Sequence, residues 1–287
     1  MIMFPAAMAV ATACQLPAGW DAVEARHTPY VVFGEVHGSS EAPDFVGETA
    51  CALARRGDRI LVAIEQRGSE SEALQRVWRL PHPGFTAALR ALPMWAGRND
   101  GVGSEAMFAL LVRLHALSAS GKRIDIVAFD GPKDDAQRAR FGGLPGQGVR
   151  EASQAANIRT AASLARYDRV LVLTGNAHAR LLPVRFGQST YDAMAMHLAS
   201  RGQITSLDLR ADAGTSWNCQ MSGRPEPGKP IDASQIKCEP FPYSGSNSPG
   251  GKPRIVLGAT DERIRFDPAY DGFFFVGRVT ASPPLVR

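Results

Sequence analysis

Ionisable side chains stand directly after four separate apolar runs of this sequence. Glu35 and His37 follow the first run, Glu65 the second, Asp130 the third and His178 the fourth. Each position alone has a structural explanation, because an Asp before a Gly often makes only an Asx turn and a histidine after a strand is often a hydrogen-bonded structural residue. Four such positions in one chain favour a shared site, if the fold brings the four ends together.

These residue types suit the hydrolysis of a small molecule. A histidine beside carboxylates can act as a general base toward water, and the second histidine can polarise a carbonyl or protonate a leaving group. The predicted catalytic residues are His37, Glu35, Glu65 and His178. The same four side chains could equally bind a divalent metal that activates water, and the residue types leave both alternatives open.

Other familiar motifs and partners are not indicated. The sequence has no GxSxG, which disfavours the serine mechanism of α/β-hydrolases, and no HExxH, P-loop or GxGxxG after the first apolar run. The net charge is +4, and the basic residues are scattered rather than interleaved with aromatic residues, so nucleic-acid binding is not predicted. The expected partner is a small-molecule substrate or ligand.

Three further residues are expected to contact the substrate. Asp130 belongs to the predicted site itself. Arg150 begins a helix and either holds an anionic group or pairs with a site carboxylate, with a solvated helix start as the structural alternative. Trp95 opens the loop 95–101, which is expected to close over the site with Trp95 as an apolar wall, unless this loop is only a surface turn.

The apolar runs alternate with amphipathic stretches, which is typical of a sheet covered by helices. The expected strands span residues 30–33, 60–64, 124–129, 170–173 and 204–209, and the expected helices span 43–56, 71–80, 104–121 and 150–166. In an open parallel sheet the carboxyl ends of the strands lie along one edge, where ligands bind. The sequence therefore predicts an α/β fold with a central, mostly parallel sheet flanked by helices and with the polar residues at one edge.

Two segments interrupt this alternation. Residues 81–103 contain three prolines and four glycines and are expected to be irregular, as a lid-like insertion. After residue 211 the sequence is rich in Pro, Gly and Ser, and two late apolar runs, 255–257 and 273–276, are expected to be strands. We expect an α/β core domain over residues 14–210 that carries the site, and a C-terminal β extension of the same domain over residues 211–287.

The N-terminus resembles an export signal. Residues 1–13 are almost wholly apolar and lead through small residues to Cys14, a pattern that suits a signal segment with lipid attachment at Cys14. A buried N-terminal helix or strand is the alternative. No stretch reaches the roughly 20 apolar residues that span a bilayer. The expected location is periplasmic or otherwise exported, with membrane attachment only through a lipid on Cys14.

The four cysteines fit that compartment. Cys219 and Cys238 flank a loop that is poor in apolar residues, where a disulfide would restrict the unfolded chain. Cys51 lies among apolar neighbours in an expected helix and is predicted to be a buried thiol.

Three stretches resemble a known superfamily. Residues 34–41 (GEVHGSSE) are similar to the GExxHGSxE signature of erythromycin-esterase-like proteins. Residues 175–178 (GNAH) resemble the second histidine motif of a wider group that also holds ChaN-type haem-binding lipoproteins and the TraB/Tiki proteins. Residues 150–158 resemble the RDxxMAxNI segment of the esterases, with Glu151 in place of Asp. The resemblance covers about Val31 to Leu209, with a weaker echo at residues 270–273.

The branches of this superfamily imply different functions. The esterases imply hydrolysis of an ester or lactone, with His37 as the base that activates water, Glu35 and Glu65 in support, His178 in the same site and Glu41 near the substrate. The Tiki branch implies metal-dependent peptide cleavage by similar residues. The ChaN branch implies haem or iron binding without catalysis on a surface lipoprotein. This chain is shorter than the esterases and lacks an evident large helical insertion, which argues against a macrolide as the substrate.

Overall fold

The computed structural model describes residues 14–223, 233–245, 248–258 and 266–286. Its centre is a seven-stranded sheet in the order β10-β11-β7-β1-β4-β2-β3. Neighbouring strands are parallel except for the outer pair, β10 and β11. The strands are β1 (Tyr30–Glu35), β2 (Ile60–Arg67), β3 (Ile124–Asp130), β4 (Arg169–Gly175), β7 (Ile204–Arg210), β10 (Arg254–Leu257) and β11 (Gly272–Phe275). The predicted fold class, a mostly parallel α/β sheet, is confirmed.

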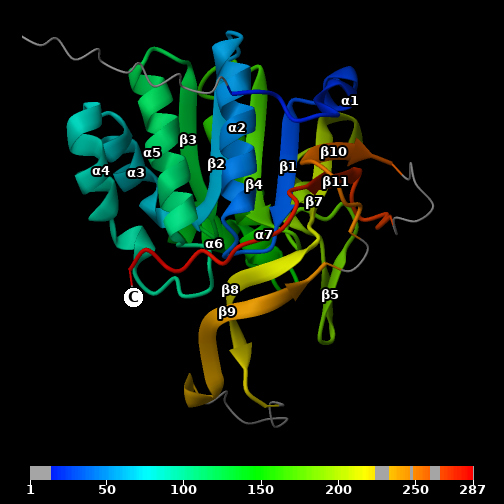
Figure 1. The fold of residues 1–287 in the computed structure, drawn as a ribbon. Helices are drawn as coiled ribbons and strands as arrows, with labels where there is room; N and C mark the ends of the chain where they lie inside the picture. Colours follow the sequence, from blue (N-terminus) through cyan, green and yellow to red (C-terminus); the bar gives the residue numbers. More distant parts are fainter. Residues whose placement is uncertain (1–13, 224–232, 246–247, 259–265, 287) are drawn as a thin grey trace, which may run out of the picture.

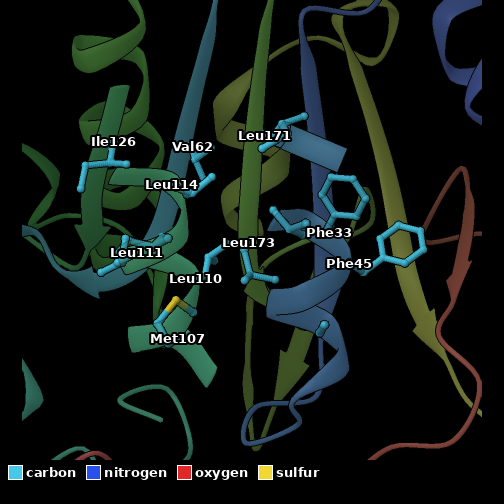
Figure 2. Packing of buried hydrophobic residues seen from close by; sticks show 14 of the residues in the cluster. Phe33, Phe45, Val62, Met107, Leu110, Leu111, Leu114, Ile126, Leu171 and Leu173 are labelled. Atoms are coloured by element: carbon cyan, nitrogen blue, oxygen red, sulfur yellow. The ribbon is translucent and has the colours of Figure 1, made fainter. Parts of the chain in front are cut away.

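Helices cover both faces of the sheet (Figure 1). One face packs on α2 (Glu41–Arg55) and α5 (Glu105–Ala119), and the other packs on α7 (Gly148–Ala162) and the short α8 (Met194–Leu198). Successive side chains of a strand point to opposite faces, so Phe33 joins the first core and Val32 the second. Figure 2 shows Phe33 beside Phe45 of α2 in the first core. Burial on both faces explains why the strands are continuous apolar runs.

The remaining helices lie at the periphery of the sheet. They are α1 (Trp20–Ala25), α3 (Ser71–Trp78), α4 (His82–Arg90) and α6 (Asp135–Phe141). The expectation of an irregular segment at residues 81–103 was wrong in part, because α4 and a 3₁₀ turn (Pro93–Trp95) lie there. Pro81 and Pro83 suit the first turn of α4, and Phe85 and Leu89 bury its inner face. Only the part from Ala96 to Gly103 is a loop.

The C-terminal segment completes the sheet and adds a hairpin. β8 (Ala213–Met221) and β9 (Ile236–Ser244) pair with each other and extend past the carboxyl edge of the sheet (Figure 1). A smaller hairpin, β5 (Val184–Phe186) with β6 (Ser189–Tyr191), also projects at this edge. The two late apolar runs form β10 and β11, as the sequence predicts, and β11 pairs in parallel with β7.

All four cysteines form disulfides. Cys219 is bonded to Cys238 across β8 and β9, the two positions that flank the loop poor in apolar residues. Cys51 is bonded to Cys14, so the expectation of a buried thiol at Cys51 was wrong. The apolar neighbours of Cys51 on α2 do not reveal its partner, which comes from the segment before α1. A sulfur in a disulfide cannot also carry a lipid, so this bond and lipid attachment at Cys14 exclude each other. The expected signal, residues 1–13, lies outside the described residues.

No helix within the described ranges is both long enough and apolar enough to cross a membrane.

Candidate active site

The loop after β1 carries the first histidine. Glu35, the last residue of β1, is buried, and its Oε1 lies 2.9 Å from His37 Nδ1. The His37 ring rests against Gly175 at the end of β4, where a Cβ would lie 2.7 Å from Nε2. A glycine is therefore required at position 175 for the ring to occupy this place.

Glu65, on β2, is the centre of the site. Its Oε2 accepts hydrogen bonds from the Thr174 hydroxyl and the Gly175 N–H, each at 2.7 Å. Its Oε1 accepts a hydrogen bond of 2.9 Å from Arg150. The Nε2 atoms of both histidines approach the same carboxylate, His37 at 3.6 Å and His178 at 3.3 Å. The two imidazoles, which are remote in the sequence, therefore share one site, as the strand-end pattern predicts.

Glu151 holds the second histidine. His178 Nδ1 lies 2.8 Å from both carboxylate oxygens of Glu151, and Glu151 Oε2 also accepts the Met194 N–H at 2.8 Å. Glu151 is buried on α7. We did not predict this role from the sequence. The signal was present in the resemblance, where Glu151 stands at the acidic position of the RDxxMAxNI segment.

Arg150 and Asp130 are paired with each other beside Glu65. Arg150 Nε donates to Asp130 Oδ1 at 2.7 Å, while its Nη2 binds Glu65, so Arg150 pairs with site carboxylates as one of the two alternatives had it. Asp130 also accepts hydrogen bonds from Gln154 at 2.9 Å and from Arg98 at 3.2 Å. Asp130 is thus surrounded by donors, and its contacts in this structure orient Arg150.

The charges of these groups are strongly coupled. Burial alone would raise the pKa of Glu65, but His178, His37 and Arg150 hold this pKa well below its usual value. Burial opposes the charged form of His178, yet Glu65 and Glu151 raise its pKa to about 10. Burial likewise opposes the charged form of His37, and Glu65 and Glu35 still raise its pKa above the usual value. His178 is therefore a cation near neutral pH.

Glu35 differs from the other carboxyl groups. Burial raises its pKa, and the hydrogen bond to His37 offsets only part of this effect. Its Oε1 faces His37, while its Oε2 is buried and has no hydrogen-bond partner among the described residues. One oxygen of Glu35 therefore fixes the His37 ring. Because its pKa is raised, the Glu35 carboxylate takes up a proton at a higher pH than an ordinary glutamate does.

These side chains line an open pocket of about 420 Å³ at the carboxyl edge of the sheet. The predicted residues that line it are Glu35, His37, Glu65, Arg150 and His178. Residues that we did not predict also line it, including Asp100, Asn176 and Asn218. Asp100 comes from the loop after α4 and Asn218 from β8. Neither residue lies at the end of a strand of the central sheet. Their positions in the pocket depend on how a loop and a hairpin cross the edge of the sheet, which the strand-end pattern does not predict.

Trp95 and Glu41, which the sequence analysis expects near the substrate, lie outside this pocket. Trp95 is fully buried, donates from its indole N–H to the Leu89 carbonyl at 2.7 Å and packs edge-on against Phe108. It is a core residue, and Arg98 and Asp100 of the same segment reach the site instead. Glu41 begins α2 and accepts the Thr280 N–H at 2.8 Å, away from the pocket. The helix carries Glu41 away from the loop that holds His37.

The site fits a divalent metal poorly. No three His, Cys, Asp or Glu side chains of the described residues are arranged to hold a metal ion. Both histidines aim Nε2 at Glu65, whose oxygens are already occupied by Arg150 and by two other donors. A haem would also find little apolar surface, since Val36, Val102 and Ala177 are the main apolar residues among the charged and polar ones that line the pocket. Arg150 occupies the place where a cation would bind Glu65.

Comparison with known proteins supports the fold but assigns no family. No protein-family model matches the sequence, and no curated protein matches it. A succinoglycan biosynthesis protein has a similar structure, with a TM-score of 0.57 and 11% identity over 92% of both chains. A variant of the erythromycin esterase EreC in its open conformation has a TM-score of 0.56 and 13% identity, over 92% of this chain and 94% of that chain.

A third structure, ChaN of Campylobacter jejuni with cofacially bound haem, has a TM-score of 0.39 and 14% identity, over 67% of this chain and 85% of that chain. A likeness at that level carries no argument. The other two show a shared fold at low identity, and a shared fold does not fix the reaction.

Proposed function

We propose that this protein is a hydrolase that cleaves an ester, lactone or related bond of a small molecule with water activated by His37. The observation that carries the proposal is the arrangement of two histidines on either side of Glu65, each with its own carboxylate partner, in an open pocket. The fold shared with an erythromycin esterase agrees with it.

His37 is the general base in this proposal. When neutral, its Nδ1–H donates to Glu35, which leaves the Nε2 lone pair free. The 3.6 Å between Nε2 and Glu65 Oε2 is too long for a direct hydrogen bond, so Nε2 can accept a proton from water. The water oxygen then attacks the carbonyl carbon, and Glu65 and Glu35 stabilise the imidazolium that forms.

His178 is the general acid. It is protonated near neutral pH and its ring is fixed by Glu151. As the bond between the carbonyl carbon and the leaving oxygen breaks, His178 gives its proton to that oxygen. His37 then releases its proton to solvent, and His178 takes up a proton from solvent, which restores the starting state. Arg150, which lines the pocket, stabilises the negative charge that develops on the carbonyl oxygen.

The test is replacement of His37. After a substrate is found in a panel of small esters and lactones, His37→Ala should lower kcat/KM by about 10²–10⁴-fold, the usual contribution of a general base. Circular dichroism and Tm should stay near those of the unaltered protein. His27→Asn is the control. His27 is exposed and has a left-handed backbone conformation, which asparagine also accepts. It lies before β1, at the opposite end of this strand from His37. Equal turnover by His37→Ala would exclude the mechanism.

We also propose that the protein is exported. Two disulfides favour an oxidising compartment, and the apolar N-terminal residues suit an export signal. Because Cys14 is engaged with Cys51, we propose that its sulfur carries no lipid.

A further inference from the structure

A carboxylate at the mouth of the pocket has an open oxygen. The Asp100 side chain lines the pocket and is 56% exposed. Its Oδ1 accepts the Val102 N–H at 3.3 Å and lies 3.6 Å from Arg98 Nε. Its Oδ2 has no hydrogen-bond or ion-pair partner in the described part of the chain. A ligand in the pocket can therefore bind this oxygen.

Asn218 offers a second acceptor. Its Nδ2 donates to the Ser216 carbonyl at 3.3 Å and to the Ser216 hydroxyl at 3.0 Å. A carbonyl can only accept, so the amide nitrogen has to lie on the Ser216 side. Asn218 Oδ1 is left without a hydrogen-bond partner among the described residues, and Asn218 lines the same pocket as Asp100.

Both acceptors are held in place before any ligand binds. Gln66 on β2 donates to the Val102 carbonyl at 3.0 Å, which fixes the loop that carries Asp100. The Trp217 N–H donates to the Gly38 carbonyl at 2.9 Å, which fixes β8 next to the His37 loop. A Cβ at Gly101 would lie only 2.6 Å from Gly38 N, so the two loops touch through their backbones. Such preorganisation reduces the entropy cost of binding.

The other carboxylates of the site have cationic partners. Glu35 is paired with His37 and Glu151 with His178. Glu65 and Asp130 share Arg150. Asp100 also lies near a cation, Arg98, but only its Oδ1 takes part, at 3.6 Å, and its Oδ2 has no partner among the described residues. A group that carries both hydrogen-bond donors and a positive charge would donate to Asp100 Oδ2 and Asn218 Oδ1 and would also form an ion pair with Asp100.

We propose that Asp100 and Asn218 form a specificity subsite for a protonated amine of the substrate, next to the bond that is hydrolysed. This inference rests on the proposed hydrolase function and names its substrate class: esters or lactones that bear an amino group. A neutral hydroxyl would donate to the same oxygens but would bring no positive charge to Asp100 Oδ2, so an amine is preferred over a hydroxyl.

The test compares three esters with one leaving group. The 4-nitrophenyl esters of 6-aminohexanoic, 6-hydroxyhexanoic and heptanoic acid differ only at the end of the acyl chain, in an ammonium, a hydroxyl and a methyl group. We expect kcat/KM to be about tenfold higher for the amino ester than for the heptanoate, with the hydroxy ester in between. Asp100→Asn should abolish the advantage of the amino ester, and Asn218→Ala should reduce it.

Asp44→Asn is the matched control, because Asp44 is an exposed aspartate of α2 outside this pocket, with its side chain 73% exposed. It should keep the order of the three esters. An order that is the same in Asp100→Asn and in the unaltered protein would overturn the subsite.

A binding measurement separates this inference from the proposed reaction. If none of the three esters is hydrolysed, calorimetry with 6-aminohexanamide and heptanamide still tests the subsite. Tighter binding of the amino compound that is lost in Asp100→Asn supports the subsite even where hydrolysis fails. Equal binding of the two amides overturns the subsite and leaves the hydrolase proposal standing on its own test.

Discussion

At the scale of single residues, one carboxylate sets the pKa of two histidines. Glu65 receives both imidazole Nε2 atoms, Arg150 and two hydrogen-bond donors at the end of β4. Its ionised form is what raises the pKa of His37 and of His178 against the effect of burial. The protonation states of His37 and His178 that the mechanism needs therefore both depend on the charge of Glu65.

Glu65→Gln keeps the size of the side chain and removes its charge. We expect the pKa of His178 to fall from about 10 and that of His37 to fall as well, because both lose the same carboxylate. NMR titration of the imidazole C–H signals measures both values. Glu151→Gln is the comparison: it should lower the pKa of His178 and leave that of His37 in place, since of the two histidines Glu151 hydrogen-bonds only His178. Unchanged values in Glu65→Gln would contradict the central role of this residue.

The same shifts predict the pH dependence of hydrolysis. The base has to be neutral, so activity should rise with pH through the pKa of His37, which lies above its usual 6.5. The acid has to be protonated, so activity should fall again as the pH passes about 10, the pKa of His178. The expected profile of kcat/KM is a bell on the alkaline side of neutrality. A plateau that already begins at pH 5 would show that His37 is not the base.

The convergence of the strand-end residues could be predicted from the sequence because the strands of a parallel sheet all end at one edge. Glu35 and Asp130 are the last residues of β1 and β3, Glu65 lies near the end of β2, and His37 and His178 follow β1 and β4. Glu151 was missed because a buried acid on a helix looks like any other helical acid until its partner is known. Trp95 was misplaced because an aromatic residue among glycines suits a lid and a core equally well.

At the scale of elements, the hairpin β8–β9 and the loop 97–103 close one side of the pocket. Gly38, Gly101 and Trp217 meet there through their backbones. The sequence predicted a lid-like insertion but did not predict α4, whose buried Phe85 and Leu89 give it a packed inner face. The hairpin was not predicted as such, because its burial pattern lacks the clear alternation of a core strand.

Gly38 is the residue on which this closure depends most. Its φ is +73°, and a Cβ there would collide with the Trp217 carbonyl oxygen. Gly38→Ala should lower the free energy of unfolding by about 3 kcal/mol, from backbone strain and overpacking together. Gly57→Ala is the control, because Gly57 also has a positive φ, +105°, but nothing lies within 4 Å of the added Cβ. It should cost about 1 kcal/mol. Urea unfolding measures both, and equal losses would show that the contact with Trp217 is unimportant.

At the scale of the whole molecule, the Cys14–Cys51 disulfide ties the segment before α1 to α2, across 37 positions of sequence. A crosslink that closes a loop of this length stabilises a protein by about 3–4 kcal/mol through the entropy of the unfolded chain. Replacing both cysteines with serine should lower the free energy of unfolding by that amount. The pocket should keep its activity, since neither residue lines it.

The oxidised protein should also show no reactive thiol under denaturing conditions, because all four cysteines are paired. A lipid on the Cys14 sulfur would instead leave a thiol free at Cys51. A thiol assay with intact mass spectrometry distinguishes the two outcomes.

The hydrogen bonds that end on the Gly38 carbonyl join three remote parts of the chain. This carbonyl accepts the N–H of Trp217 and, at 2.8 Å, the N–H of Ser282. One backbone oxygen beside His37 therefore links the loop after β1 to β8 and to the segment that follows β11. Local opening of that last segment would remove one of the two donors and loosen the loop that positions His37.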